Sequence, residues 1–289
     1  LKMYVNIDDN FFIKYKKSDE ILLKSIEFVA NQKKVKYSAI KKVYEKKDKV
    51  NIDLPKNSLK NNFDIIVKRN FKRDLKFIDI KKFEIFYKTD IKTDLFIERI
   101  KKFKLLNIKF FPKTFLKDDF IFQKLSKGNF YRPNKLSEIS NYLLKEVAEV
   151  VNVLSSNFNK NLKVLDFLEN FELNLTNNKL TKKIVEINLL KLNKSNNKDI
   201  KFSLTHGDLK FEHLFLYQGK LEYVIDWETV ESRSIFFDLF NFFVPWFARR
   251  SYNYFEIKKF ILNFIENHLP NLESLIQERY DLYFNLFVL

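Results

Sequence analysis

Glycine, cysteine and histidine are scarce in this chain of 289 residues. It holds three glycines, three histidines and no cysteine, where average usage would give roughly twenty glycines. Glycines at 128, 207 and 219 form neither a G-x-G-x-x-G dinucleotide fingerprint nor a G-x-x-x-x-G-K-[ST] phosphate loop. The lack of cysteine excludes a disulfide framework, a thiolate zinc site and a cysteine nucleophile. Three histidines argue against a histidine-rich metal site.

Positive charge and phenylalanine are abundant. Lys plus Arg number 53 against 37 Asp plus Glu, which gives a net charge of +16, and there are 33 Phe. Heavy use of Lys, Asn, Ile and Phe is typical of an AT-rich genome, and such a bias would spread the charge over solvated faces. The functional interpretation is attraction to a phosphate-bearing partner: a nucleotide, a nucleic acid or an anionic membrane surface.

The ends of the chain and its apolar runs indicate the cellular location of the protein and the extent of the sequence. The first residues carry no apolar signal region, and no run of 18 or more apolar residues would span a membrane. Together with the lack of cysteine, this predicts a cytoplasmic protein, with contact at the inner membrane face as a further expectation. The chain does not begin with Met, and residues 280–289 stop inside an apolar pattern, which predicts a piece of a longer protein.

Hydrophobic spacing predicts an α+β fold with two lobes. Residues 18–32 have helical spacing, and the Lys-rich residues 33–60 are predicted to be a loop. Short β-prone runs follow at 63–67, 75–80, 83–87, 113–116 and 120–123, with a helix over 93–107 between them. Helices are predicted at 135–156, 161–174 and from 235 to the end, around a polar loop at 191–199 and a β-rich patch at 204–226. This layout predicts a small antiparallel β lobe, a hinge near 124–128 and a larger, mostly helical lobe.

The densest chemical signal lies at residues 204–228. Two of the three histidines and Gly207 fall within eleven residues, in Leu-Thr-His-Gly-Asp-Leu-Lys-Phe-Glu-His-Leu. A predicted hairpin turning at Gly219 would then return Asp226 beside Asp208 and His213. Phosphoryl transfer to a hydroxyl needs a carboxylate that accepts the proton and further groups that hold Mg²⁺ on the ATP phosphates. Asp208 suits the first role and Asp226 the second.

This segment resembles the catalytic core of the aminoglycoside phosphotransferase and choline kinase group, which has a protein-kinase-like fold. That group reads His-Gly/Asn-Asp-Leu-x-x-x-Asn, a hairpin, then Ile-Asp-Trp/Phe-Glu. Here the first part is His-Gly-Asp-Leu-Lys-Phe-Glu-His over 206–213, and the second is Ile-Asp-Trp-Glu over 225–228. The resemblance implies that Asp208 is the catalytic base, that His213 stands in the place of the metal-binding Asn, and that Asp226 is the main Mg²⁺ ligand. It also matches Asp238 to a carboxylate that braces this region.

His213 departs from the pattern of this group, and Lys210 resembles the pattern of a different family. Imidazole at 213 is a poorer partner for Mg²⁺ than an oxygen ligand. Lys210 also resembles the catalytic-loop Lys of protein kinases, which faces the transferring phosphate. Gly207 in place of Arg, and Asp-Trp-Glu in place of Asp-Phe-Gly, favour the small-molecule group.

The resemblance also implies nucleotide-binding residues upstream. Lys88, ending a predicted strand, would bind the α- and β-phosphates, and Glu98 on a helix would pair with it; Lys68 is the rival Lys. Gln123 and Leu125 would lie in the hinge that grips adenine through backbone groups. Without a Gly-rich loop, residues 69–74 are the candidate for covering the phosphates.

These expectations divide the chain into three parts. Residues 1–60 would be an N-terminal extension or the start of the N-lobe, 61–128 the nucleotide-binding N-lobe and hinge, and 129–289 the catalytic and acceptor-binding C-lobe. ATP is expected between the lobes. The predicted activity is ATP- and Mg²⁺-dependent phosphorylation of a hydroxyl, with a sugar or cell-surface glycan intermediate preferred as acceptor.

Alternative acceptors and alternative functions stay open. A choline-like acceptor would call for an aromatic cage, for which the candidates are Trp246, Tyr252 and Tyr254, although core packing also explains them. An aminoglycoside would call for acidic side chains, for which the candidates are Glu228, Glu231, Asp238 and Glu266. A catalytically inactive kinase-like module is one rival. A basic nucleic-acid-binding protein is another, and it predicts steeply salt-dependent oligonucleotide binding.

Overall fold

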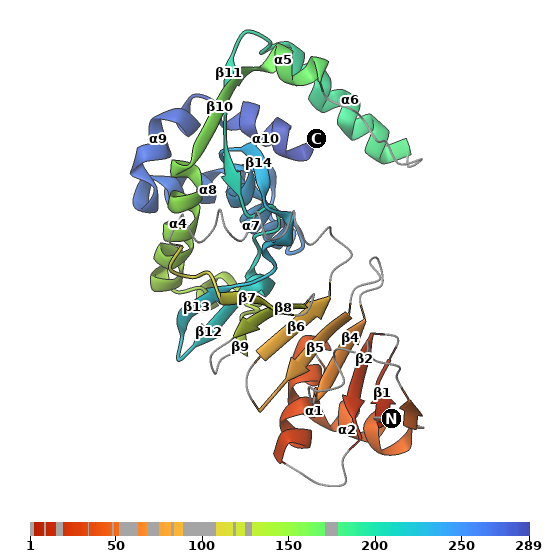
Figure 1. Cartoon of the computed structure of the whole chain (residues 1–289). Coiled ribbons are helices and arrows are strands. Elements are labelled where there is room, and N and C mark those ends of the chain that lie inside the picture. The colour runs from red at the N-terminus through yellow and green to blue at the C-terminus, as the bar shows by residue number, and fades with distance from the viewer. Residues whose placement is uncertain are drawn as a thin grey trace. The chain divides into compact units, whose positions relative to one another are not determined.

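The structure is a computed structural model that describes most of the chain. The described residues are 3–8, 10–15, 20–33, 35–47, 49–51, 63–68, 75–81, 84–88, 108–117, 120–124, 129–170 and 179–289. The chain divides into two compact units: unit 1 covers 1–105 and 111–130, and unit 2 covers 106–110 and 131–289. Each is described on its own below (Figure 1). The predicted α+β class is confirmed, with an antiparallel sheet in unit 1 and a mostly helical unit 2.

Unit 1 is built on one eight-stranded antiparallel sheet. Its order is β3-β1-β2-β4-β5-β6-β8-β7. The strands are β1 Met3–Asn6, β2 Phe11–Lys14, β3 Lys49–Asn51, β4 Ile65–Lys68, β5 Leu75–Asp79, β6 Glu84–Lys88, β7 Lys113–Lys117 and β8 Phe120–Lys124, and the short β9 Asn129–Phe130 ends the unit. Tyr4, Phe63, Ile66 and Phe77 form a buried cluster against this sheet. The five strands predicted between 63 and 123 are confirmed.

The prediction of a loop over 33–60 is wrong for the part that the structure describes. Helix α1, Glu20–Lys33, is followed by α2, Tyr37–Lys46, and by β3. Ile40 and Tyr44, four residues apart, are the buried face of α2. Lysines cover its other faces, so a Lys-rich composition concealed an amphipathic helix. Because β1 and β3 pair in one sheet with the later strands, residues before 60 are part of unit 1.

The register of β4, β5 and β6 places the two candidate lysines. Leu75 pairs with Lys68 on one side and with Lys88 on the other. Lys68 and Lys88 therefore lie at the same end of the sheet, two strand spacings apart, or about 10 Å. The predicted phosphate ligand Lys88 and its rival Lys68 thus lie at the same end of the sheet, on either side of β5.

Unit 2 combines a three-stranded sheet, a hairpin and a set of helices. The helices are α4 Asn141–Ser156, α5 Val164–Glu169, α6 Lys179–Asn193, α7 Phe237–Ala248, α8 Tyr254–His268, α9 Pro270–Gln277 and α10 Tyr280–Val288, with short 3-10 turns η2 Leu136–Glu138, η3 Phe211–His213 and η4 Trp227–Thr229. The sheet is β10 Phe158–Lys163, β11 Asp199–Thr205 and β14 Glu231–Ser234, in the order β10-β11-β14. The hairpin is β12 Leu214–Tyr217 and β13 Lys220–Val224.

The helix predicted over 161–174 is wrong in its first part. Residues up to Lys163 belong to β10, and the helical part of the range that the structure describes is α5, Val164–Glu169. Leu162 pairs with Ile200 on β11, and this long-range pairing overrides the local helical pattern. The predicted loop at 191–199 is shorter than expected, because α6 continues to Asn193 and β11 begins at Asp199.

Buried aromatic rings hold the helices of unit 2 together. Phe240 of α7 packs edge-on against Tyr280 and Phe284 of α10, and Phe243 packs against Phe260 and Phe264 of α8. Much of the high phenylalanine content therefore fills a core that fixes α7. Among the helices that the structure describes, none is both long enough and apolar enough to cross a membrane.

Candidate functional site

The loop over residues 206–213, here called the 206–213 loop, is anchored by Asp238 of α7. β11 ends at Thr205, and the next two backbone N–H groups, of His206 and Gly207, donate to the two carboxylate oxygens of Asp238 at 2.6 and 2.9 Å. The Asp238 side chain is buried, and this burial raises its pKa to about 6, although both N–H groups act to lower it. A carboxylate on a helix fixed by the aromatic core thus sets the start of the loop.

Gly207 occupies a position that no other residue fits. Its φ is +83°, and a Cβ there would come within 2.3 Å of the Thr229 carbonyl oxygen and 2.4 Å of Nη1 of Arg233. The same guanidinium nitrogen donates to Thr229 O and to Thr205 Oγ1, and Thr229 Oγ1 donates to His206 O. Thr205, Thr229 and Arg233 thus form a hydrogen-bonded frame that encloses the backbone at residue 207.

His206 has a structural role. The Ile225 carbonyl at 2.9 Å can only accept, so Nε2 of His206 carries the proton, and Nδ1 accepts the Asp208 N–H at 3.3 Å. The ring packs 4.5 Å from that of Trp227. Burial lowers the pKa of His206 to about 3, so the ring is neutral at physiological pH. The ring joins the 206–213 loop to the strand that precedes Asp226.

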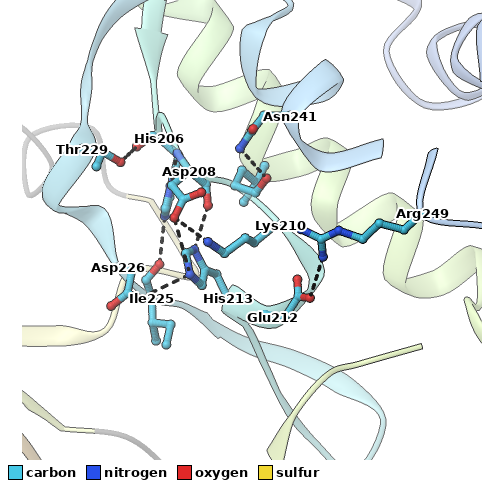
Figure 2. Close-up of polar contacts among 11 residues, drawn as sticks. His206, Asp208, Lys210, Glu212, His213, Ile225, Asp226, Thr229, Asn241 and Arg249 are labelled. Carbon is cyan, nitrogen blue, oxygen red and sulfur yellow. Dashed lines mark hydrogen bonds and ion pairs between the residues drawn. The ribbon is translucent and has the colours of Figure 1, made fainter. Parts of the chain in front are cut away.

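Asp208 presents a partly exposed carboxylate beside Lys210 and His213 (Figure 2). Its Oδ2 lies 2.7 Å from Nζ of Lys210 and 3.7 Å from Nε2 of His213, and its side chain is 39% exposed. The His213 side chain is only 8% exposed, and its Nδ1 lies 2.7 Å from the Asp208 carbonyl oxygen. One carboxylate is thus reachable from solvent and flanked by a cation and an imidazole.

Asp226 lies next to His213 and completes the group formed with Asp208 and Lys210. The Ile225 N–H donates to the His213 carbonyl at 3.0 Å, and Oδ2 of Asp226 lies 3.3 Å from Nε2 of His213. Asp226 is in the left-handed conformation, with φ 63° and ψ 46°, a region that Asp tolerates better than most residues. Burial lowers the pKa of His213, while Asp226 and Asp208 oppose that effect. The structure therefore brings Asp208, Lys210, His213 and Asp226 together, as the motif spacing predicted.

The predicted nucleotide-binding residues belong to unit 1. Glu98 and Leu125 lie outside the described residues, and for Lys88 the structure describes the backbone at the end of β6. Gln123 is buried in β8, where its Nε2 donates to Oγ1 of Thr114 at 3.2 Å. The Gln123 side chain is thus occupied inside the sheet, and residue 123 pairs with Ile85 of β6 and Thr114 of β7. The hinge role of Gln123 stays a prediction.

Three residues that support the site were not found from the sequence. Thr229 and Arg233 brace Gly207, and Nδ2 of Asn241 donates to the Leu209 carbonyl at 3.1 Å. Asn241 follows Asp238 by three residues, which puts both on one face of α7, and that spacing is the signal by which it was detectable. Thr229 and Arg233 carry no such local signal.

The residues considered for acceptor binding make other contacts. The Trp246 indole donates to Pro133 O and is covered by the Arg250 guanidinium at 3.8 Å from its ring. Tyr254 packs against Tyr280 and Phe284 and bonds to Asp281. Tyr252 packs against Phe247. These contacts favour core packing over an aromatic cage.

Comparison with known proteins gives structural similarities only. No family model matches the sequence, and no curated protein matches it. A thermostable mutant of aminoglycoside phosphotransferase APH(4)-Ia is 11% identical, with a TM-score of 0.47, over 76% of this chain and 81% of its own. The streptomycin–ATP complex of APH(2")-IIa is 16% identical, with a TM-score of 0.47, over 81% and 89%. Choline kinase LicA from Streptococcus pneumoniae is 14% identical, with a TM-score of 0.43, over 71% and 70%.

Identities of 11 to 16% and TM-scores of 0.43 to 0.47 are too low to assign an activity. The proposal that follows therefore depends on the residues of the site.

Proposed function

We propose that this chain is an ATP- and divalent-cation-dependent phosphotransferase that phosphorylates a hydroxyl of a small molecule. One observation carries the proposal: the carboxylates of Asp208 and Asp226 converge on Nε2 of one buried imidazole, at 3.7 and 3.3 Å. One of these carboxylates is open to solvent and the other is largely enclosed, with 39% and 18% of the side chain exposed. Phosphoryl transfer requires this division between a proton acceptor and a cation ligand.

Asp208 is proposed to orient the acceptor hydroxyl and take its proton. As the hydroxyl oxygen forms its bond to the γ-phosphorus, the bond from that phosphorus to the β,γ-bridging oxygen breaks, and ADP leaves with the electron pair. The hydroxyl proton passes to the Asp208 carboxylate and then to solvent. The exposure of Asp208 supports this role, because an acceptor can reach its carboxylate.

Lys210 is proposed to balance charge at the point of transfer. Its ammonium group contacts the Asp208 carboxylate, so a phosphoryl group transferred to a hydroxyl held at Asp208 would come within reach of this positive charge. The contact also restricts the rotation of Asp208 before an acceptor arrives.

His213 and Asp226 are the residues proposed to hold the divalent cation, with Mg²⁺ implied by the resemblance. Over the residues that the structure describes, no group of three His, Cys, Asp or Glu is arranged to hold a metal. An imidazole nitrogen and a carboxylate fit a cation that takes its other ligands from ATP phosphates and water. When bound, the cation would neutralise charge on the β- and γ-phosphates. Lys88, paired with Glu98, remains the proposed partner of the α- and β-phosphates, and Lys68 is the rival Lys.

For the acceptor, a sugar or glycan intermediate is the preferred class. Trp246 and Tyr254 are engaged in core contacts, which weakens support for a choline cage. Asp238 is buried and bonded to backbone, so it offers no acidic wall for an aminoglycoside. The net charge of +16 supports an anionic acceptor and peripheral contact with an anionic membrane.

Mg-ATP binding separates this proposal from its rivals. We expect Mg-ATP to raise the melting temperature of the whole chain by mass action, and a screen of sugars, amines and antibiotics to identify an acceptor that increases ADP release. Steeply salt-dependent oligonucleotide binding with no response to Mg-ATP would favour the nucleic-acid-binding alternative. A melting shift with no turnover for any acceptor would favour the inactive module.

A further inference from the structure

We propose that helix α6 binds the surface of an anionic membrane through a face of exposed Leu and Ile side chains bordered by lysines. The inference rests on the proposed function only in the membrane contact named there, and it deepens that contact by naming the surface that makes it. It does not depend on the phosphotransferase activity.

Exposed apolar side chains are concentrated on α6. Among the residues that the structure describes, eleven large apolar side chains are exposed, and four of them belong to this helix. The four are Leu180, Ile184, Ile187 and Leu190, and they are 42–66% exposed. Single exposed apolar residues are ordinary on a protein surface, whereas a contiguous set indicates a surface that binds a partner.

These four residues lie on one side of the helix and are here called the exposed face of α6. Successive residues of an α-helix are turned by about 100°, so their spacing of four, three and three residues places them within an arc of about 120°. Val185, Asn188 and Leu192 are buried and lie outside this arc. Helix α6 packs against α5 and α10 (Figure 1). The helix therefore uses one side for the core and presents a second apolar side to solvent.

Lysines border the exposed face of α6. Residues 180–198 hold five Lys and one Glu. Lys183 falls within the apolar arc, and Lys194 and Lys198 lie in the turn that follows the helix; all three are exposed. Apolar side chains among lysines are typical of a helix that lies in the interface of an anionic membrane, where the ammonium groups meet the lipid phosphates. With 15 residues, α6 is too short to span a bilayer, which takes about 20.

A second copy of the chain and an acidic protein fit this face less well. Two copies of α6 would bring two sets of lysines together, and like charges repel. An acidic protein would satisfy the charge, but protein partners usually enclose an amphipathic helix in a groove. Because α5 and α10 already pack against α6, only one arc of the helix is available. That arc fits a flat surface, and a bilayer provides one.

Vesicle binding by the full chain tests this proposal. The probes are vesicles of phosphatidylcholine alone and vesicles that also hold about one-quarter phosphatidylserine. We expect the wild-type chain to bind the second kind, and Leu180→Gln with Leu190→Gln to weaken that binding by roughly tenfold or more. Both side chains are largely exposed, so the melting temperature should stay near that of the wild type.

The matched control for this variant removes exposed apolar side chains from other elements. Leu23→Gln with Tyr217→Gln changes one such residue on α1 and one on β12, and it should bind vesicles as the wild type does. Equal binding by the wild type and the α6 variant overturns the proposal.

Replacement of lysines tests the electrostatic part separately. We expect Lys183→Gln with Lys194→Gln to lower binding to the phosphatidylserine vesicles by roughly tenfold, and to change binding to phosphatidylcholine much less. Lys41→Gln with Lys42→Gln, at exposed positions of α2, is the control and should have little effect. Equal losses in the two pairs would show that net charge alone drives binding, and would overturn the assignment to α6.

The remaining outcomes separate this inference from its alternatives. A chain that binds no vesicles overturns it, and a dimer in sedimentation that Leu180→Gln with Leu190→Gln dissociates would then assign the face to a second copy. No vesicle experiment uses ATP or an acceptor. Absence of turnover therefore counts against the phosphotransferase activity alone, and absence of vesicle binding counts against the membrane contact alone.

Discussion

Nζ of Lys210 lies 2.7 Å from Oδ2 of Asp208, two residues earlier in the chain. Both side chains are 39% exposed, and a pair this open to water stabilises a fold by no more than about 1 kcal/mol. The contact therefore matters for charge at the site and little for stability.

Replacing Lys210 should separate these two effects. We expect Lys210→Gln to lower the rate of phosphoryl transfer by roughly 10² to 10³, and to change the free energy of unfolding by less than about 1 kcal/mol. Transfer kinetics and urea unfolding measure the two quantities. Lys220→Gln, at the exposed start of β13, is the control and should alter neither. A Lys210→Gln protein that transfers at the wild-type rate would remove Lys210 from the reaction.

The two described glycines with positive φ form a matched pair. A Cβ at Gly207 meets Thr229 O and Arg233 Nη1, whereas a Cβ at Gly219 meets nothing within 4 Å, at φ values of +83° and +77°. Alanine at 219 should cost about 1 to 2 kcal/mol for left-handed backbone alone. Alanine at 207 should cost more, at least about 3 kcal/mol, because it also displaces the frame around the loop.

Urea unfolding of Gly207→Ala and Gly219→Ala measures that difference. We expect Gly207→Ala to lose transfer activity as well, since the loop carries Asp208, and Gly219→Ala to keep it. Equal losses of stability in the two variants would show that the enclosure of residue 207 is not important for the fold.

Local sequence predicted which residues come together at the site better than it predicted the residues that support them. The 206–213 loop and Asp226 were predictable because the motif, the hairpin turn at Gly219 and the flanking β-prone runs all lie within a short stretch. Thr229 and Arg233 were missed because they act on Gly207 across about twenty residues, through contacts that depend on how η4 and β14 pack. The spacing of residues in the sequence does not predict such contacts.

The same contrast holds for the fold. The strands from 63 onward were predicted from short apolar runs. Their order in the sheet was not predicted, because β2, near the start of the chain, lies next to β4 and brings β1 and β3 into the sheet with it. Helix α2 was missed because its buried face is only Ile40 and Tyr44. Residues 158–163 form the strand β10 because they pair with β11, although the local spacing of apolar residues favoured a helix.

Stability should depend on pH through Asp238. Its pKa is about 6 in the folded chain against an ordinary value of 3.8, so the folded state holds the proton more tightly. The stabilisation is complete below pH 3.8 and is lost as the pH rises through about 6, which amounts to about 3 kcal/mol at ~1.4 kcal/mol per unit.

Asp238→Asn removes this titration and leaves one backbone N–H of the loop without an acceptor. We expect the variant to be less stable than the wild type by about 1 to 3 kcal/mol at pH 7, with the gap widening as the pH falls from 6 to 4. Urea unfolding at several pH values measures the gap, with Asp199→Asn at the exposed start of β11 as control. A gap that stays constant over this range would contradict the assigned pKa.

The most direct test of the central claim is the rate of acceptor-dependent ADP formation in Asp208→Asn. With saturating ATP, divalent cation and an acceptor found by the screen, we expect this variant to lower the rate by at least about 10³, while its ATP affinity and melting temperature stay near those of the wild type. Glu212→Gln, which changes a carboxylate four residues further along the same loop, should keep the wild-type rate. An Asp208→Asn protein with near wild-type turnover would contradict the account.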